Sequence, residues 1–164
     1  TASLVPKIVT RGRSAGITHF STAACLNSSS VAFDDWDVLT EISSTLQSQR
    51  PPIAHGDLTP WNVLLAEGQV VVLDWESAHN CRSPTDDCAH WVVSSGALLK
   101  KWTPAQAASL LETEVIPRLQ RKLAIPAEDL HVALKQSLQN LAERAGRRGG
   151  YAAACAEALS ARSH

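Results

Sequence analysis

The strongest constraint on the fold is a pair of short β-type runs in a chain whose second half has helical patterning. Residues 62–65 (Asn-Val-Leu-Leu) and 70–73 (Val-Val-Val-Leu) are separated by four residues that include a glycine, which is typical of a β-hairpin. With the turn centred on those four residues, Asn62 lies opposite Leu73, next to Asp74. The hairpin therefore predicts that an amide oxygen and a carboxylate oxygen come together.

The segments before this hairpin predict two strands and one helix. Residues 4–26 contain two β-type runs separated by a glycine-containing break, which indicates two short strands joined by a turn. Asp34 or Asp35 can cap a helix that ends before Pro51. Its apolar residues recur at helical spacing on one face: Val38, Leu39, Ile42 and Leu46.

From Thr85 onward the pattern is helical. Residues 103–106 (Thr-Pro-Ala-Gln) have the form of a capping box, and leucines and a valine follow at four-residue spacing, with Pro117 expected to kink that helix. Another helix is expected from Pro126 to Gly146, and a last, alanine-rich helix follows the break at 147–150. The inward-facing residues of these helices are Leu111, Val115, Leu119, Leu123, Leu130, Leu134, Leu138 and Leu141. The fold class is therefore predicted as α+β, mainly α.

Composition excludes several classes of function. The 164 residues carry 15 Lys and Arg against 16 Asp and Glu, so the chain has no electrostatic footprint for nucleic acid or for anionic membranes. No apolar run approaches the roughly 20 residues that span a bilayer, and the N-terminus has no signal-peptide pattern. The four cysteines form no CxxC pair. We therefore expect a soluble cytoplasmic protein with reduced thiols and with neither nucleic-acid nor membrane partners.

Three oxygen-bearing residues are placed to act together. Asn62 and Asp74 supply the hard oxygen ligands that Mg²⁺ prefers, and substrate phosphates commonly complete such a site. Asp57 stands five residues before Asn62, in a loop that begins His55-Gly56, and we expect it to be unpaired with any nearby base. A carboxylate beside a magnesium site can orient a hydroxyl group and accept its proton.

These motifs resemble a known family. Residues 55–62 (His-Gly-Asp-Leu-Thr-Pro-Trp-Asn) reproduce the spacing of the kinase catalytic loop H-R-D-x-x-x-x-N, and residues 73–76 (Leu-Asp-Trp-Glu) stand where protein kinases carry D-F-G. Together they resemble the aminoglycoside phosphotransferase and choline kinase family, which has the protein-kinase-like fold. The resemblance implies ATP and Mg²⁺ as cofactors.

The resemblance also implies roles for individual residues. Asp57 would be the catalytic base, and Asn62 and Asp74 the magnesium ligands. His55 would organise the catalytic loop, and Asp87, preferred over Asp86, would brace it. Glu76 would face the outer shell of the metal, a cationic substrate or water.

The sequence departs from the family pattern upstream of His55. No glycine-rich loop or strand lysine is recognisable there, and Lys7 follows a proline with no glycine loop before it. Residues 4–26 resemble the last strands of the small lobe, so we expect the first half of that lobe to be missing. The expected organisation is a remnant of the small-lobe strands and hinge (1–30), the catalytic core of the large lobe (31–102) and a C-terminal helical subdomain (103–164).

Two functions remain open. The first is an ATP-dependent phosphotransferase that acts on a hydroxyl group of a small molecule, incomplete as this chain and completed by a further small-lobe segment. The second is a non-catalytic, kinase-like remnant that acts as a binding module. The sequence does not choose among antibiotic, amino alcohol and sugar substrates.

Two further patterns are interpreted as structural. His79, Cys81, Cys88 and His90 do not have the spacing of a zinc knuckle, and in a helix residues i and i+2 point apart, so we expect no metal site there. The five tryptophans are expected to pack the core and the lobe interface rather than to form a stacking platform.

Overall fold

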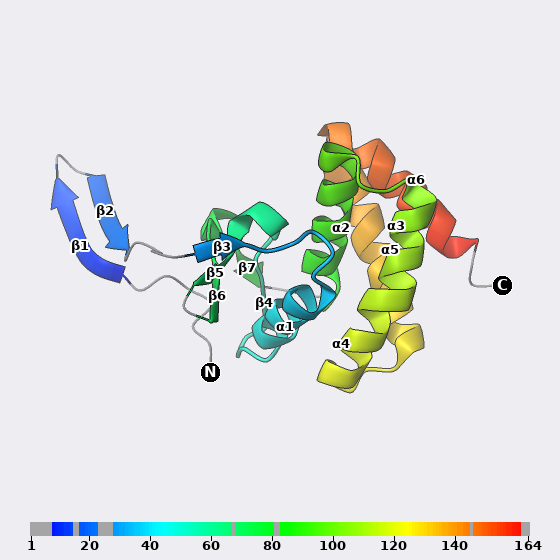
Figure 1. The fold of residues 1–164 in the computed structure, drawn as a ribbon, viewed down its shortest axis with the longest axis horizontal. Helices are drawn as coiled ribbons and strands as arrows, with labels where there is room; N and C mark the ends of the chain where they lie inside the picture. Colours follow the sequence, from blue (N-terminus) through cyan, green and yellow to red (C-terminus); the bar gives the residue numbers. More distant parts are fainter. Residues whose placement is uncertain are drawn as a thin grey trace.

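The computed structural model describes residues 8–14, 17–22, 28–66, 68–80, 83–144 and 146–161. Strands β1 (Ile8–Ser14) and β2 (Ile17–Thr22) pair antiparallel, which confirms the two strands predicted near the N-terminus. This hairpin lies at one end of the molecule, away from the helices (Figure 1). Lys7 lies outside the described residues.

The predicted central hairpin is present with the predicted register. Strands β5 (Val63–Ala66) and β6 (Gln69–Val72) pair so that Val63 faces Val72, and the short strand β3 (Ser28–Ser30) joins the outer side of β5. The amide of Leu73 donates a 2.8 Å hydrogen bond to the carbonyl oxygen of Asn62. Asn62 is therefore opposite Leu73, as the turn length indicated.

A second, two-residue ladder fixes the segments on either side of this hairpin. Strand β4 (Ile53–Ala54) pairs antiparallel with β7 (His79–Asn80). The loop after β4 contains the 3₁₀ turn η1 (Pro60–Asn62), and the segment before β7 contains the 3₁₀ turn η2 (Trp75–Ser77). The two motif segments are thus held next to each other at both ends.

Helix α1 (Trp36–Gln47) begins at the predicted position. Asp35 is its N-cap, and its carboxylate accepts a 3.1 Å hydrogen bond from the amide of Val38. The face bearing Leu39, Ile42 and Leu46 is buried. The apolar spacing in the sequence therefore identified the core-facing side of this helix.

The C-terminal half is helical, as predicted, with two local differences. The capping box at Thr103 and Gln106 begins α3, but a π-helical turn interrupts regular α-helix immediately before Pro117, because proline has no amide to donate. The predicted break at 147–150 is shorter, since the last helix already begins at Gly149. The elements are α2 (Asp86–Leu99), α3 (Pro104–Leu110), η3 (Leu111–Val115), α4 (Ile116–Leu123), α5 (Ala127–Arg144), η4 (Gly146–Arg148) and α6 (Gly149–Ser160).

One hydrophobic cluster joins these elements, running from Val31 to Leu159. Helix α5 packs on α2 and α6, and α1 packs on α4. Trp91 is a fully buried member of this cluster, whereas Trp61 is 45% exposed and is not a core residue. The fold is α+β and mainly α, as expected for the large lobe of a kinase-like protein. Within the described part of the chain, no helix has the length and apolar character needed to cross a bilayer.

Candidate active site

The loop that follows β4 is held by a buried carboxylate. Asp87, in the first turn of α2, accepts hydrogen bonds from the amides of His55 (2.9 Å) and Gly56 (3.0 Å). Burial raises the pKa of Asp87 above its ordinary value, and the two backbone donors act in the opposite direction. Asp86 instead accepts a 2.6 Å hydrogen bond from the hydroxyl of Ser137. Asp87 is therefore the residue that ties the loop to α2.

His55 connects this loop to the end of the central hairpin. Its Nε2 lies 2.8 Å from the carbonyl oxygen of Leu73, so Nε2 is the protonated nitrogen, and Nδ1 accepts from the amide of Asp57 (3.3 Å). The buried ring packs edge to face on Trp75, with the ring centroids 4.8 Å apart. The imidazole thus spans the two motif segments.

Asn62 is oriented by two hydrogen bonds. Its side-chain amide donates to the carbonyl oxygen of Asp57 (3.0 Å), and its backbone carbonyl accepts from Leu73. Donation through the NH₂ group leaves the Oδ1 atom of this buried side chain available to a cation. This amide oxygen belongs to the residue opposite Leu73, which precedes Asp74.

Asp74 has a strained backbone. Its φ of 61° and ψ of 63° lie in the left-handed region, which costs a residue other than glycine on the order of 1–2 kcal/mol. Asp74 is exposed to solvent. Strain of this kind is concentrated at functional sites, and it fits a carboxylate that must be aimed in one direction.

The donor set suits magnesium. Asn62 and Asp74 supply a neutral and an anionic oxygen, the ligand type that Mg²⁺ takes when phosphates and waters complete its octahedron. Among the described residues, no group of three or more His, Cys, Asp and Glu side chains could hold a metal ion by itself. Glu76 is exposed in the turn that follows Asp74.

Gly56 is required by the approach of the two motif segments. Its φ is +81°, and a Cβ atom at this position would collide with the carbonyl oxygen of Ser77. This contact explains why the position that carries arginine in protein kinases is a glycine here.

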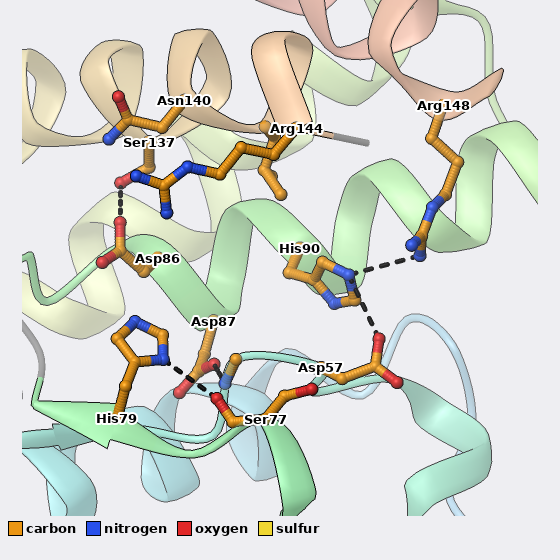
Figure 2. A pocket seen from close by; sticks show the side chains of 12 residues that line it. Asp57, Ser77, His79, Asp86, Asp87, His90, Ser137, Asn140, Arg144 and Arg148 are labelled. Atoms are coloured by element: carbon orange, nitrogen blue, oxygen red, sulfur yellow. Dashed lines mark hydrogen bonds and ion pairs between the residues drawn. The ribbon is translucent and has the colours of Figure 1, made fainter. Parts of the chain in front are cut away.

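The sequence analysis missed His90, which contacts Asp57, and Arg148, which contacts His90. His90 Nε2 lies 3.3 Å from Oδ1 of Asp57, and Nη1 of Arg148 lies 3.3 Å from the same nitrogen of His90 (Figure 2). Arg148 also donates to the hydroxyl of Ser94 (3.1 Å). The expectation that Asp57 has no nearby base is wrong, because residues 57 and 90 are distant in sequence but adjacent in space.

The protonation of His90 follows from its partners. Nδ1 lies 3.2 Å from the carbonyl oxygen of Leu58, which can only accept, so Nδ1 carries a proton. Burial lowers the pKa of His90, although its bond to Leu58 and the carboxylate of Asp57 oppose that shift. The imidazole is therefore mainly neutral at pH 7. Its unprotonated Nε2 has a single lone pair, which accepts from Arg148.

The cysteine and histidine pattern around α2 forms other contacts. The thiol of Cys88 is buried, with its sulfur 3.2 Å from the hydroxyl of Ser43, and burial raises its pKa to about 12. His79 Nδ1 lies 3.0 Å from the carbonyl oxygen of Ser77. Cys81 lies outside the described residues. The contacts that are described are packing and hydrogen bonding.

A pocket of about 260 Å³ opens beside Asp57. Its floor is the loop that follows β4 and the start of α2, and its opposite wall comes from α5 and η4 (Figure 2). The polar and charged residues that line it include Asp57, His79, Asp86, His90, Asn140, Arg144 and Arg148. A small molecule in this pocket would lie against the carboxylate of Asp57.

Comparison with known proteins agrees with the family predicted from the motifs. Residues 19–80 match the model of the phosphotransferase enzyme family, a segment that contains both motifs and the hairpin between them. No curated protein and no solved structure matched the chain. Over residues 19–80, the chain is therefore similar to the phosphotransferase enzyme family.

Proposed function

We propose that this chain supplies the catalytic lobe of an ATP-dependent phosphotransferase that acts on a hydroxyl group of a small molecule. The observation that carries the proposal is the hydrogen-bonded connection of the two motifs. Asn62 bonds to both Asp57 and Leu73, and His55 bonds to Leu73 as well. One network thus joins Asp57 and Asn62 to Leu73, the residue before Asp74, in a segment that matches the phosphotransferase family.

In this proposal Asp57 orients the substrate hydroxyl and accepts its proton. His90 lies beside this carboxylate, with Nε2 3.3 Å from Oδ1 of Asp57. Asn62 and Asp74 would hold Mg²⁺, which when bound neutralises charge on the nucleotide phosphates. Positioning and charge neutralisation supply most of the rate enhancement in reactions of this class.

A non-catalytic binding module is the second candidate. The observation in its favour is that the described loop, α2, α5 and η4 by themselves form the pocket of about 260 Å³. Such a protein would keep the folded lobe and its pocket without binding nucleotide.

Calorimetric titration of Mg²⁺-ATP into this chain separates the two candidates. The proposal expects binding that Asp74→Asn abolishes and that Asp34→Asn, at an exposed position outside the site, leaves intact. Absence of binding by the wild-type chain would refute it as a nucleotide site and support the binding module.

Transfer itself is tested with Asp57→Asn. Loss of the base should lower kcat by about 10²- to 10⁴-fold while Mg²⁺-ATP affinity stays within a few fold. An unchanged kcat would remove Asp57 from the reaction.

A further inference from the structure

The pocket beside Asp57 has a distinct wall opposite the catalytic loop. Arg144 is the last residue of α5, Arg148 closes the following 3₁₀ turn, and both side chains line the pocket (Figure 2). Asn140 lies one turn before Arg144 on the same helix. Three hydrogen-bond donors thus face a pocket whose other side is Asp57.

The carboxylates next to this wall are already occupied. Asp87 accepts two backbone amides, and Asp86 accepts the hydroxyl of Ser137. Both carboxylates therefore already accept hydrogen bonds from groups of this chain. Of the aspartates that line the pocket, Asp57 is the one placed for the reacting hydroxyl.

The donors, in contrast, have capacity left. Within the described ranges Arg144 makes no hydrogen bond or ion pair, although it is a pocket-lining cation. Arg148 uses Nη1 for His90 and Ser94, which leaves Nε and Nη2 for a ligand. Asn140 accepts from Gln136 through Oδ1, so its NH₂ group also remains.

Unused donors on two guanidinium groups recognise an anion. Arginine presents N–H groups in a planar fork that matches a carboxylate or a phosphate, and these charge-assisted bonds are stronger than neutral ones. Among the described residues that line the pocket there is no phenylalanine, tyrosine or tryptophan, so a quaternary ammonium would find no cage of these rings there. The volume of about 260 Å³ also lies below the roughly 300–1,000 Å³ typical of sites for drug-sized ligands.

We propose that the hydroxyl substrate of this site also carries an anionic group, a carboxylate or a phosphate, which Arg144 and Arg148 bind. The role given to the hydroxyl rests on the proposed phosphotransferase function, whereas binding of the anion does not. The substrate is accordingly a small hydroxylated acid or phosphate ester rather than a polycation.

Four three-carbon or similarly small probes test the charge preference: glycerate, glycerol 3-phosphate, glycerol and choline. Each is titrated into the full chain, with amide chemical shifts in α5 and the catalytic loop as the readout. At least one anion should bind about tenfold or more tightly than glycerol and choline, and the ratio of the two anions distinguishes carboxylate from phosphate. Equal or tighter binding of choline, or no binding by any probe, would overturn the proposal.

Arg144→Gln is the decisive variant, because Arg148 also supports His90. This variant should bind the preferred anion about tenfold more weakly than the wild type does. Arg121→Gln, at an exposed arginine on α4, should leave that affinity unchanged. An unchanged affinity in Arg144→Gln would show that the anion binds elsewhere.

The outcome is independent of the nucleotide experiment. If Mg²⁺-ATP fails to bind but glycerate or glycerol 3-phosphate binds through Arg144, the phosphotransferase proposal fails and the anion site stands. If Mg²⁺-ATP binds and both anions behave like glycerol, the reverse holds.

Discussion

Gly56 combines a left-handed backbone with a close approach to Ser77. Replacement by alanine should destabilise the protein by at least about 1–2 kcal/mol, because a Cβ adds a backbone penalty and a collision with the Ser77 carbonyl oxygen. Urea unfolding measures this difference. Because β4 and β7 flank the contact, the variant should also disturb the amide resonances of His79.

Gly68 provides the matched control. Its φ is +74°, but a Cβ would meet no atom within 4 Å. Gly68→Ala should therefore show the backbone penalty alone and cost less than Gly56→Ala. Equal losses in the two variants would mean that the contact with Ser77 adds nothing.

A second prediction for a single residue concerns His90 and the pH dependence of the free energy of unfolding. Since burial lowers its pKa in the folded state, the unfolded chain binds more protons between that value and about 6.5. The contribution of His90 is fully present above pH 6.5 and is lost as the pH falls through its folded pKa. The slope cannot exceed about 1.4 kcal/mol per pH unit for one proton.

His90→Asn should remove that part of the acid destabilisation. The wild type minus variant difference in unfolding free energy should therefore fall between pH 7.5 and 5.5, with Asp57, Asp87 and Arg148 as the charged groups that face the imidazole. NMR titration of the His90 ring checks the cause directly. A midpoint at or above 6.5 would contradict this account.

The candidate site was only partly predictable from residue spacing. Asp57, Asn62 and Asp74 are close in sequence, so the loop length and the hairpin register were enough to bring them together. His90 follows Asp87 by three residues, and helical periodicity could have placed it on the same face of α2. Arg148 gave no such signal, because its position depends on how α5 and η4 pack against α2.

At the scale of elements, the capping box of α3 gives a simple test. Thr103 Oγ1 accepts from the amide of Gln106 (3.3 Å), and Gln106 Oε1 accepts from the amide of Thr103 (2.9 Å). Thr103→Ala should lower the free energy of unfolding by about 1 kcal/mol. Chemical denaturation is the measurement.

Thr113→Ala is the control for the same residue type. Thr113 is exposed in the interior of the helical segment, where its hydroxyl bonds to the carbonyl oxygen of Ser109. Alanine has the higher helix propensity, so this variant should be neutral or slightly stabilising. A loss equal to that of Thr103→Ala would contradict the capping explanation.

Elements were predictable where a local rule decides them. The register of β5 and β6 follows from the length of their turn, and the start of α1 follows from its cap. The π-helical turn Leu111–Val115 was not predictable, because four-residue apolar spacing is the same in α-helical and slightly widened turns. The sequence predicted an irregularity near Pro117, but it did not predict that the irregularity would be a π-helical turn.

At the scale of the whole molecule, one core crosses the expected boundary at 102/103. Leu134 on α5 is fully buried in the cluster that also contains Trp91 on α2. Leu134→Ala should therefore cost about 2–5 kcal/mol and destabilise both halves together. The tryptophans lie between residues 36 and 102, so their fluorescence reports the first half, while far-UV circular dichroism also reports α3 to α6.

The expected result is that both probes shift to the same lower urea midpoint. Val132→Ala, on the same helix but 70% exposed, should leave the midpoint nearly unchanged. If fluorescence kept the wild-type midpoint while circular dichroism became biphasic, residues 103–164 would unfold independently. Coincident transitions would instead mean that the wall carrying Arg144 and Arg148 is held by the same cooperative unit that holds Asp57, and substitutions in either half would then alter the geometry of the pocket.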